Sequence, residues 1–239
     1  MSGHSKWAGI KHKKALVDAK RGSSFTKIAN TITVAAKQGG GDPGLNPSLR
    51  VAIDKARAAN MPKDNVDRAI KRGTGELGGA AVEELLYEGF GPGNVAVLVE
   101  ALSDNRNRSN ADVRLIFTKN GGRIAEGGGV AYQFTQKGVL RVDLPANQTE
   151  AFEEAVIESG ADDYTLGDGY AIVYVPAASL HSVKDQIETA GFPVDSAKIE
   201  RVANSPIEAD EETLEKLEKL LDALDENDDV TNVYTNLAE

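Results

Sequence analysis

Residues 210–236 have the sequence DEETLEKLEKLLDALDENDDVTNVYTN, and this segment indicates how the domains are arranged along the chain. Leucines recur along its first half at a spacing of three or four residues, which predicts a helix with one apolar face. The leucines on this face are Leu214, Leu217, Leu221 and Leu224. The segment DVTNVYTN that follows predicts a last strand. One helix and one strand can complete a sheet only if an earlier part of the chain has left it open.

The segment immediately before this stretch is complete in itself. Residues 138–203 predict the strand VLRVDL, a helix over 149–159, strands at DDYTL and YAIVYV, a helix over 178–190 and the strand AKIERV. This βαββαβ order is the one found in ferredoxin-like folds. The final helix and strand therefore belong to another unit.

An open unit lies further upstream. The segments VEELLYEGF and NVAVLVEAL predict a pair of strands around the turn GPG at 91–93, followed by a helix over 109–119 and a strand at GVAYQF. This ββαβ order lacks its last helix and strand. We therefore expect one α/β domain over 76–137 plus 205–239, with the domain 138–204 inserted into it.

The first part of the chain predicts helices instead of strands. SSFTKIANTITVAAKQGG has helical spacing, Asn46 and Pro47 suit an N-cap and first helical position, and MPKDNVDRAIKRG predicts a third helix that ends at Gly73. We expect a basic helical domain over 1–75. The predicted fold class is α+β, with this N-terminal helical domain followed by two ferredoxin-like α/β domains, the third inserted in the second.

Charge is distributed unevenly along the chain, whose formal net charge is −10. Residues 1–75 carry 15 Lys and Arg against 5 Asp and Glu, whereas 138–239 carry 6 against 24. A polyanion is attracted to the first region and repelled by the last. The alternative is that the basic and acidic domains attract each other.

Several classes of protein are disfavoured. The chain has no cysteine, which excludes disulfides and thiolate metal sites and suits a reducing compartment. It has no apolar run long enough for a membrane span and no secretory signal at its start. The motif GHSKW begins at residue 3, so we also expect no transit peptide ahead of it. We expect a cytoplasmic protein without membrane contact.

Motifs for catalysis and cofactors are weak. GTGELG at 73–78 follows a helix and lacks the strand and helix of a dinucleotide site, so it predicts a linker. The histidines His4, His12 and His181 have no carboxylate at ligand spacing. DENDD at 225–229 lacks the spacing of a calcium loop and predicts a solvated helix end. With no P-loop and no nucleophile elbow, we expect no enzyme activity, no cofactor and no metal.

Two basic features remain. The first is the opening segment GHSKWAGIKHKKALVDAKRG, where Trp7 can stack on an unpaired base or, alternatively, pack against the helical bundle. The second is SDNRNRSN at 103–110, predicted as a loop after a strand. Its arginines and asparagines can reach phosphates, ribose hydroxyls and base edges. The alternative is that Asn107 or Ser109 caps the next helix.

The motifs GHSKW, IKHKKALVDAKRGSSF, NMPKDNVDRAIKRGTG, YEGFGPGNVAVLVE and LSDNRNRS resemble those of the YebC family along nearly the whole chain. The resemblance implies a three-domain protein of gene expression without known catalysis. It implies either a DNA-binding transcriptional regulator or a ribosome-associated factor that relieves stalling on proline-rich sequences; a mitochondrial relative activates translation of cytochrome c oxidase. Asn30 and Thr31 replace an expected charged pair, and Asn94 stands where many relatives have glycine.

The basic segments indicate folded RNA more than duplex DNA, because no helix presents a defined set of base-reading side chains. From the resemblance and this pattern together we favour ribosomal RNA as the partner, with DNA as the alternative; the resemblance also implies a contact with tRNA. A protein-only regulator that docks through its acidic domains is a second alternative. The expected nucleic-acid-binding residues are His4, Lys6, Trp7, Lys11, His12, Lys13, Lys14, Lys20, Arg21, Lys27, Lys37, Arg106, Asn107 and Arg108.

Overall fold

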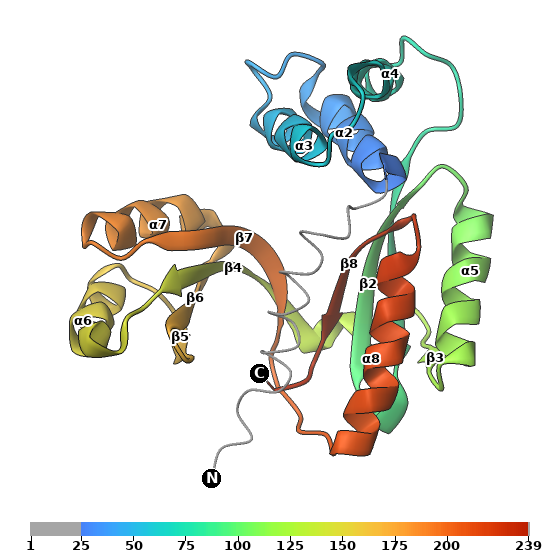
Figure 1. Cartoon of the computed structure of the whole chain (residues 1–239). Helices are drawn as coiled ribbons and strands as arrows, with labels where there is room; N and C mark the ends of the chain where they lie inside the picture. Colours follow the sequence, from blue (N-terminus) through green and yellow to red (C-terminus); the bar gives the residue numbers. More distant parts are fainter. Residues whose placement is uncertain (1–24, 239) are drawn as a thin grey trace. The chain divides into compact units, whose positions relative to one another are not determined.

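The computed structural model describes residues 25–238. The chain forms two compact units (Figure 1): the first runs to Tyr132 and resumes at Pro206, and the second comprises Gln133–Ser205. The first unit contains a helical region and a four-stranded sheet, and the second contains another four-stranded sheet. This confirms the predicted α+β class, with helices first and two sheet domains after them.

Three helices open the described chain: α2 (Phe25–Gly39), α3 (Pro47–Ala58) and α4 (Lys63–Gly73). They pack around a small apolar core that includes Ile32 and Leu49. Asn46 caps α3 as predicted, because its side chain accepts a hydrogen bond from the Leu49 amide at 3.0 Å. Its amide group also donates to carbonyls at the end of α2, so one residue ends one helix and starts the next.

The sheet of the first unit has the order β3-β1-β2-β8. Its strands are β1 (Glu83–Phe90), β2 (Ala96–Ser103), β3 (Arg123–Ile124) and β8 (Val230–Thr235). Helices α5 (Arg106–Lys119) and α8 (Glu211–Glu226) cover one face (Figure 1). The leucines of α8 are buried in this core. Strand β8 pairs antiparallel with β2, so the C-terminal helix and strand do complete a sheet begun upstream.

The strand predicted at GVAYQF is wrong. The third strand is the two-residue β3, and Ala131–Gln133 form a short 3-10 turn. The physical reason is Glu88, whose buried carboxylate accepts hydrogen bonds from the backbone N–H groups of Gly128, Val130 and Ala131 at 2.6–2.7 Å. These donors are bound to a side chain and cannot form a ladder with a neighbouring strand.

The second unit is built from one continuous segment in the predicted βαββαβ order. Its elements are β4 (Phe134–Asp143), α6 (Thr149–Glu158), β5 (Asp163–Leu166), β6 (Tyr170–Pro176), α7 (Leu180–Thr189) and β7 (Val194–Ala203). The sheet order is β5-β6-β4-β7. An apolar core that includes Leu140, Phe152 and Ile187 lies between this sheet and its two helices.

No described helix has both the length and the hydropathy to cross a membrane. Over the same residues, no group of three or more His, Asp or Glu side chains is arranged to hold a metal ion.

Candidate nucleic-acid interface

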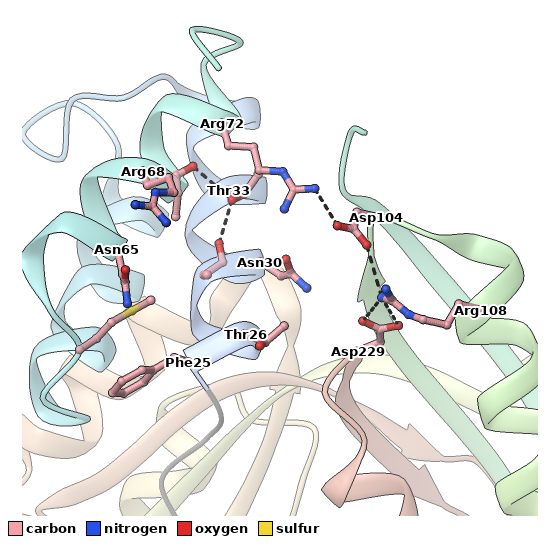
Figure 2. Close-up of a pocket in the computed structure, with 13 residues that line it drawn as sticks. Phe25, Thr26, Asn30, Thr33, Asn65, Arg68, Arg72, Asp104, Arg108 and Asp229 are labelled. Carbon is pink, nitrogen blue, oxygen red and sulfur yellow. Dashed lines mark hydrogen bonds and ion pairs between the residues drawn. The ribbon is translucent and has the colours of Figure 1, made fainter. Parts of the chain in front are cut away.

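The first unit contains a cleft of about 350 Å³ between helices α2 and α4 on one side and the junction of β2 with α5 on the other. Figure 2 shows its charged and polar side chains. The residues that line it are Phe25, Thr26, Ala29, Asn30, Thr33, Met61, Asn65, Arg68, Ala69, Arg72, Asp104, Arg108 and Asp229. Three arginines against two aspartates make the cleft cationic by one charge.

Helix α4 supplies Arg68 and Arg72. They lie one helical turn apart on the side next to the buried residues Val66 and Ala69, so both reach the cleft while the apolar face packs on α2. Arg72 extends from the end of the helix, where its Nη2 donates to the Ala80 carbonyl at 2.8 Å and to Asp104 Oδ2 at 3.0 Å. The latter bond connects the helical region to the sheet.

Helix α5 supplies Arg108 from its first turn. Asn105 is the N-cap, since its side chain accepts from the Arg108 amide at 3.1 Å, and the helix therefore begins at Arg106. Arg108 Nη2 lies 3.1 Å from both carboxylate oxygens of Asp229 and 3.3 Å from Asp104 Oδ1. Ser103 Oγ donates to Asp229 at 2.9 Å. A residue of the chain's last strand region thus holds an arginine 121 positions earlier.

The charges of this network stabilise one another. The hydrogen bond from Arg72 lowers the pKa of Asp104, and the nearby Arg108 acts in the same direction. The hydrogen bond to Asp229 and its charge raise the pKa of Arg108. The Asp229 side chain is only 5% exposed, so the guanidinium compensates a carboxylate that has left water.

The opposite wall of the cleft is formed by α2. Asn30, labelled in Figure 2, is buried. Its Nδ2 donates to the Leu102 carbonyl at 3.0 Å. Thr33 is also buried, with its hydroxyl donating to the Ala29 and Ala69 carbonyls. Phe25 lies at the start of the helix with 44% of its surface exposed. The wall therefore combines an apolar end with buried amide and hydroxyl groups.

Five of the residues expected to bind nucleic acid fall within the described chain. Arg108 lines the cleft, whereas Arg106 and Asn107 are exposed in the first turn of α5. Lys37 is exposed in the last turn of α2. Lys27 is half-buried and donates to the Asp225 carbonyl. The structure therefore brings one of the five into the cleft and leaves three others at the surface.

The remaining expected residues lie outside the described residues. They are His4, Lys6, Trp7, Lys11, His12, Lys13, Lys14, Lys20 and Arg21. Their role in binding stays a prediction.

Two expectations about this region need correction. The segment 103–110 is only partly a loop, because Asn105, and not Asn107 or Ser109, caps α5. The run DENDD is not entirely solvated, because Asp229 is buried beside Arg108. Gly73 ends α4, and residues 74–78 of GTGELG lie in the connection to β1, as expected of a linker.

Sequence reasoning missed most of the cleft. A usable signal existed for Arg68 and Arg72, because their spacing of four residues puts them on one side of a predicted helix. No local pattern distinguishes Asp104, Asp229 or Asn30 from ordinary polar residues.

The second unit has a hollow of different character. It measures about 520 Å³ and lies between α6 and α7. Glu158 and Asp185 are its charged lining residues, and the others are alanines or uncharged polar side chains. A hollow with this lining repels anions, in contrast to the cationic cleft.

Comparisons with known proteins cover nearly the whole chain. The family model described as TACO1/YebC protein N-terminal domain matches residues 5–76, and the model for the TACO1/YebC second and third domain matches residues 82–237. A relative from Treponema denticola is 52% identical over 237 residues, which cover 99% of this chain and 96% of the relative. A relative from Geobacter sulfurreducens is 51% identical, with 99% and 95% covered. Both bear the name probable transcriptional regulatory protein.

A solved structure is also similar. It is the crystal structure of a conserved hypothetical protein from Aquifex aeolicus, with 46% identity and a TM-score of 0.79. The match covers 98% of this chain and 96% of that one.

Proposed function

The chain belongs to the TACO1/YebC family, and from this membership we propose that it is a non-enzymatic, nucleic-acid-binding regulator of gene expression. The names of its relatives, which describe probable transcriptional regulatory proteins, support regulation as the general role. The cationic cleft and the exposed Arg106 and Asn107 supply groups suited to a polyanion.

The observation that carries this proposal is the separation of charge. Residues 25–75, which form α2 to α4, contain 9 Lys and Arg against 4 Asp and Glu. Residues 133–205, which form the second unit, contain 5 against 12. A polyanion therefore approaches the helical region and is repelled by the second unit.

The finer proposal is that the polyanion is ribosomal RNA. The basic side chains of the described helical region are spread over three short helices and are not gathered on one helix that could enter a major groove. This distribution favours a folded RNA, which is recognised by its shape and backbone. On this proposal the protein acts at the ribosome, close to tRNA, to relieve stalling on proline-rich sequences.

Duplex DNA is the second candidate, and the names of the relatives favour it. A transcriptional regulator should bind one sequence at least about 10³-fold more tightly than random duplex. A ribosome-binding factor has no such site.

The test is cosedimentation with ribosomes across a salt series, with duplex-DNA binding measured in parallel. A triple variant with Lys11, Lys13 and Lys14→Ala is compared with a control in which Lys184, Lys198 and Lys219→Ala. The control makes the same change in net charge at positions outside the basic region. We expect ribosome binding at physiological salt that only the first variant loses.

Each alternative has its own result. Selective binding of one duplex with release from ribosomes would replace RNA with DNA as the target. A third result would favour a protein-only regulator that docks through its acidic domains. In that case the protein binds neither nucleic acid, and the first triple variant still regulates gene expression.

A further inference from the structure

We propose that the cleft between α2, α4 and the β2–α5 junction binds one unstacked nucleotide of a single-stranded nucleic acid. The base would stack on Phe25, and its phosphate would be bound by Arg68 and Arg72. This inference rests on the proposed function, because it assigns a place and a contact mode to nucleic-acid binding.

The cleft has the size and the polarity that a nucleotide requires. Its volume of about 350 Å³ lies in the range of small-molecule sites. Figure 2 shows Phe25 on one side, Asp104, Arg108 and Asp229 on the other, and Arg68 and Arg72 on helix α4 along the top of the view. A nucleotide has the same division, with a flat apolar face on its base and a negative charge on its phosphate.

The apolar end is suited to stacking. Phe25 is 44% exposed although it is aromatic, and Met61, which is buried, also lines the cleft. An exposed ring beside a cationic wall is the arrangement by which proteins hold bases without reading their sequence. Phe25 is therefore the platform for the base.

The cationic end retains hydrogen-bond donors. Among the described residues Arg68 has no hydrogen-bond or ion-pair partner. Arg72 uses only Nη2 for its bonds to Ala80 and Asp104, whereas a guanidinium has five N–H donors. The other N–H groups of Arg72 and the whole guanidinium of Arg68 can bind phosphate oxygens in the paired geometry that arginine favours.

The side chain of Asn30 also offers an acceptor to the cleft. Asn30 is only 6% exposed, yet it lines the cleft. Its Nδ2 is bonded to the Leu102 carbonyl, and its Oδ1 has no partner among the described residues. No buried side-chain oxygen of the described residues lacks a hydrogen-bond partner, so this Oδ1 is open to solvent from the cleft. There it can accept a hydrogen bond from an amino group of a base or from a ribose hydroxyl.

The test measures binding of a fluorescent 12-nucleotide single-stranded RNA by anisotropy across a salt series. The variants are Phe25→Leu, which removes the ring but keeps an apolar side chain, and Arg68→Gln. The matched control is Arg50→Gln, which makes the same charge change at an exposed position of α3 outside the cleft. Circular dichroism verifies that each variant is folded.

We expect Phe25→Leu to weaken binding by about 5- to 150-fold, the range that loss of one stacked base gives. Arg68→Gln should lower the slope of log affinity against log salt by about 0.7, the value for one phosphate contact with a single strand. Arg50→Gln should leave the slope unchanged. Photo-crosslinking of a 4-thiouridine RNA should label the peptide that contains Phe25.

The results separate this inference from the proposed function. If wild-type protein binds RNA but Phe25→Leu has no effect and the two arginine variants behave alike, the nucleotide site is wrong and nucleic-acid binding stands. If wild-type protein binds neither ribosomes nor RNA nor DNA, the proposed function fails. AMP and inorganic phosphate are tested as competitors: tighter binding of either than of the RNA would overturn a single strand as the ligand.

Discussion

The two units of this molecule each contain a four-stranded sheet, but they differ in the polar side chains that they bury. Among the described residues, the second unit buries a single polar side chain, Ser159. The first unit buries eight: Asn30, Thr33, Asn46, Glu88, Ser103, Ser109, Asp229 and Asn236. Several of these connect segments that are far apart in the sequence.

The difference follows from how each sheet is assembled. The second unit takes its strands from one continuous segment, so its paired residues lie at most 69 positions apart, at Phe134 and Ala203. The first unit must bring the C-terminal segment to β2. There Asn236 Oδ1 accepts from the Ala96 amide at 2.8 Å, across 140 positions, and Ser103 donates to Asp229 across 126. Buried hydrogen bonds select one arrangement because a misplaced partner leaves a polar group unpaired.

The largest expected effect on stability comes from removing one large buried side chain from each core in turn. Phe117 in the first unit and Phe152 in the second are both fully buried, and Phe→Ala at either position should cost about 3–5 kcal/mol. Hydrogen exchange followed by mass spectrometry should show faster exchange in the sheet that carries the substitution. Equal acceleration in both sheets from either variant would mean that the two units do not have independent cores.

The buried carboxylate of the first unit provides the next test. Glu88→Gln replaces an acceptor of three backbone hydrogen bonds and should reduce the free energy of unfolding by about 2–3 kcal/mol. Denaturant titration measures the change. The exposed Glu83→Gln, on the same strand, should have little effect and serves as the control.

Glu88 also predicts a pH dependence. Burial alone would raise the pKa of Glu88. The hydrogen bonds from the three backbone N–H groups lower this pKa by more than burial raises it, so it lies below the ordinary value. The stabilisation is complete above the ordinary glutamate pKa of about 4.3 and is lost as pH falls through the lower folded value. Glu88→Gln should therefore weaken the acid dependence of unfolding below about pH 4.3; an unchanged acid profile would contradict this.

A smaller effect on the stability of the first unit is expected from the turn between β1 and β2. Asn94 has a φ of +58°, where a side chain other than asparagine or aspartate is unfavourable. Asn94→Ala should lower stability by about 1–2 kcal/mol. Asn94→Gly loses the same hydrogen bond from Arg123 but removes the backbone restriction, so its melting temperature should stay closer to that of the wild type. Equal losses for glycine and alanine would show that the Arg123 bond, which both variants lack, dominates over the backbone conformation.

The smallest expected effect on stability concerns the cleft itself. Asp104→Asn removes the charged partner of Arg72 and should cost less than about 1 kcal/mol, because the pair is partly exposed. The bond from Arg72 lowers the pKa of Asp104, so this contribution is present above the ordinary aspartate pKa and is lost as pH falls.

The same substitution should strengthen nucleic-acid binding by about two- to fivefold at low salt, since the cleft gains one positive charge. Anisotropy with the single-stranded RNA measures this change. Asp67→Asn, at an exposed position of α4 that does not line the cleft, is the control with the same charge change. Equal gains in the two variants would mean that the cleft has no special part in binding.

Local sequence patterns were sufficient for most secondary structure. Asn46 and Pro47 mark the start of α3 correctly, and the segments around GPG form the predicted strand pair. The patterns failed where a side chain distant in the sequence binds the backbone. The GVAYQF segment has the composition of a strand, but its amides at Val130 and Ala131 donate to Glu88. The start of α5 was misplaced because three asparagines and two serines compete for the N-cap within SDNRNRSN.

The amino-acid sequence was enough to predict the α+β class, most of the element order and the separation of basic from acidic regions, because each of these depends on composition or on residues within one element. The contacts of Asp229 with Arg108 and of Arg72 with Asp104, and the place of Asn30 in the same cleft, are known only from the folded chain. Those contacts depend on the pairing of β8 with β2 and on the packing of α2 and α4 beside it. Such long-range geometry leaves no periodic signature in the chain, since one polar side chain at one position is all that each contact requires.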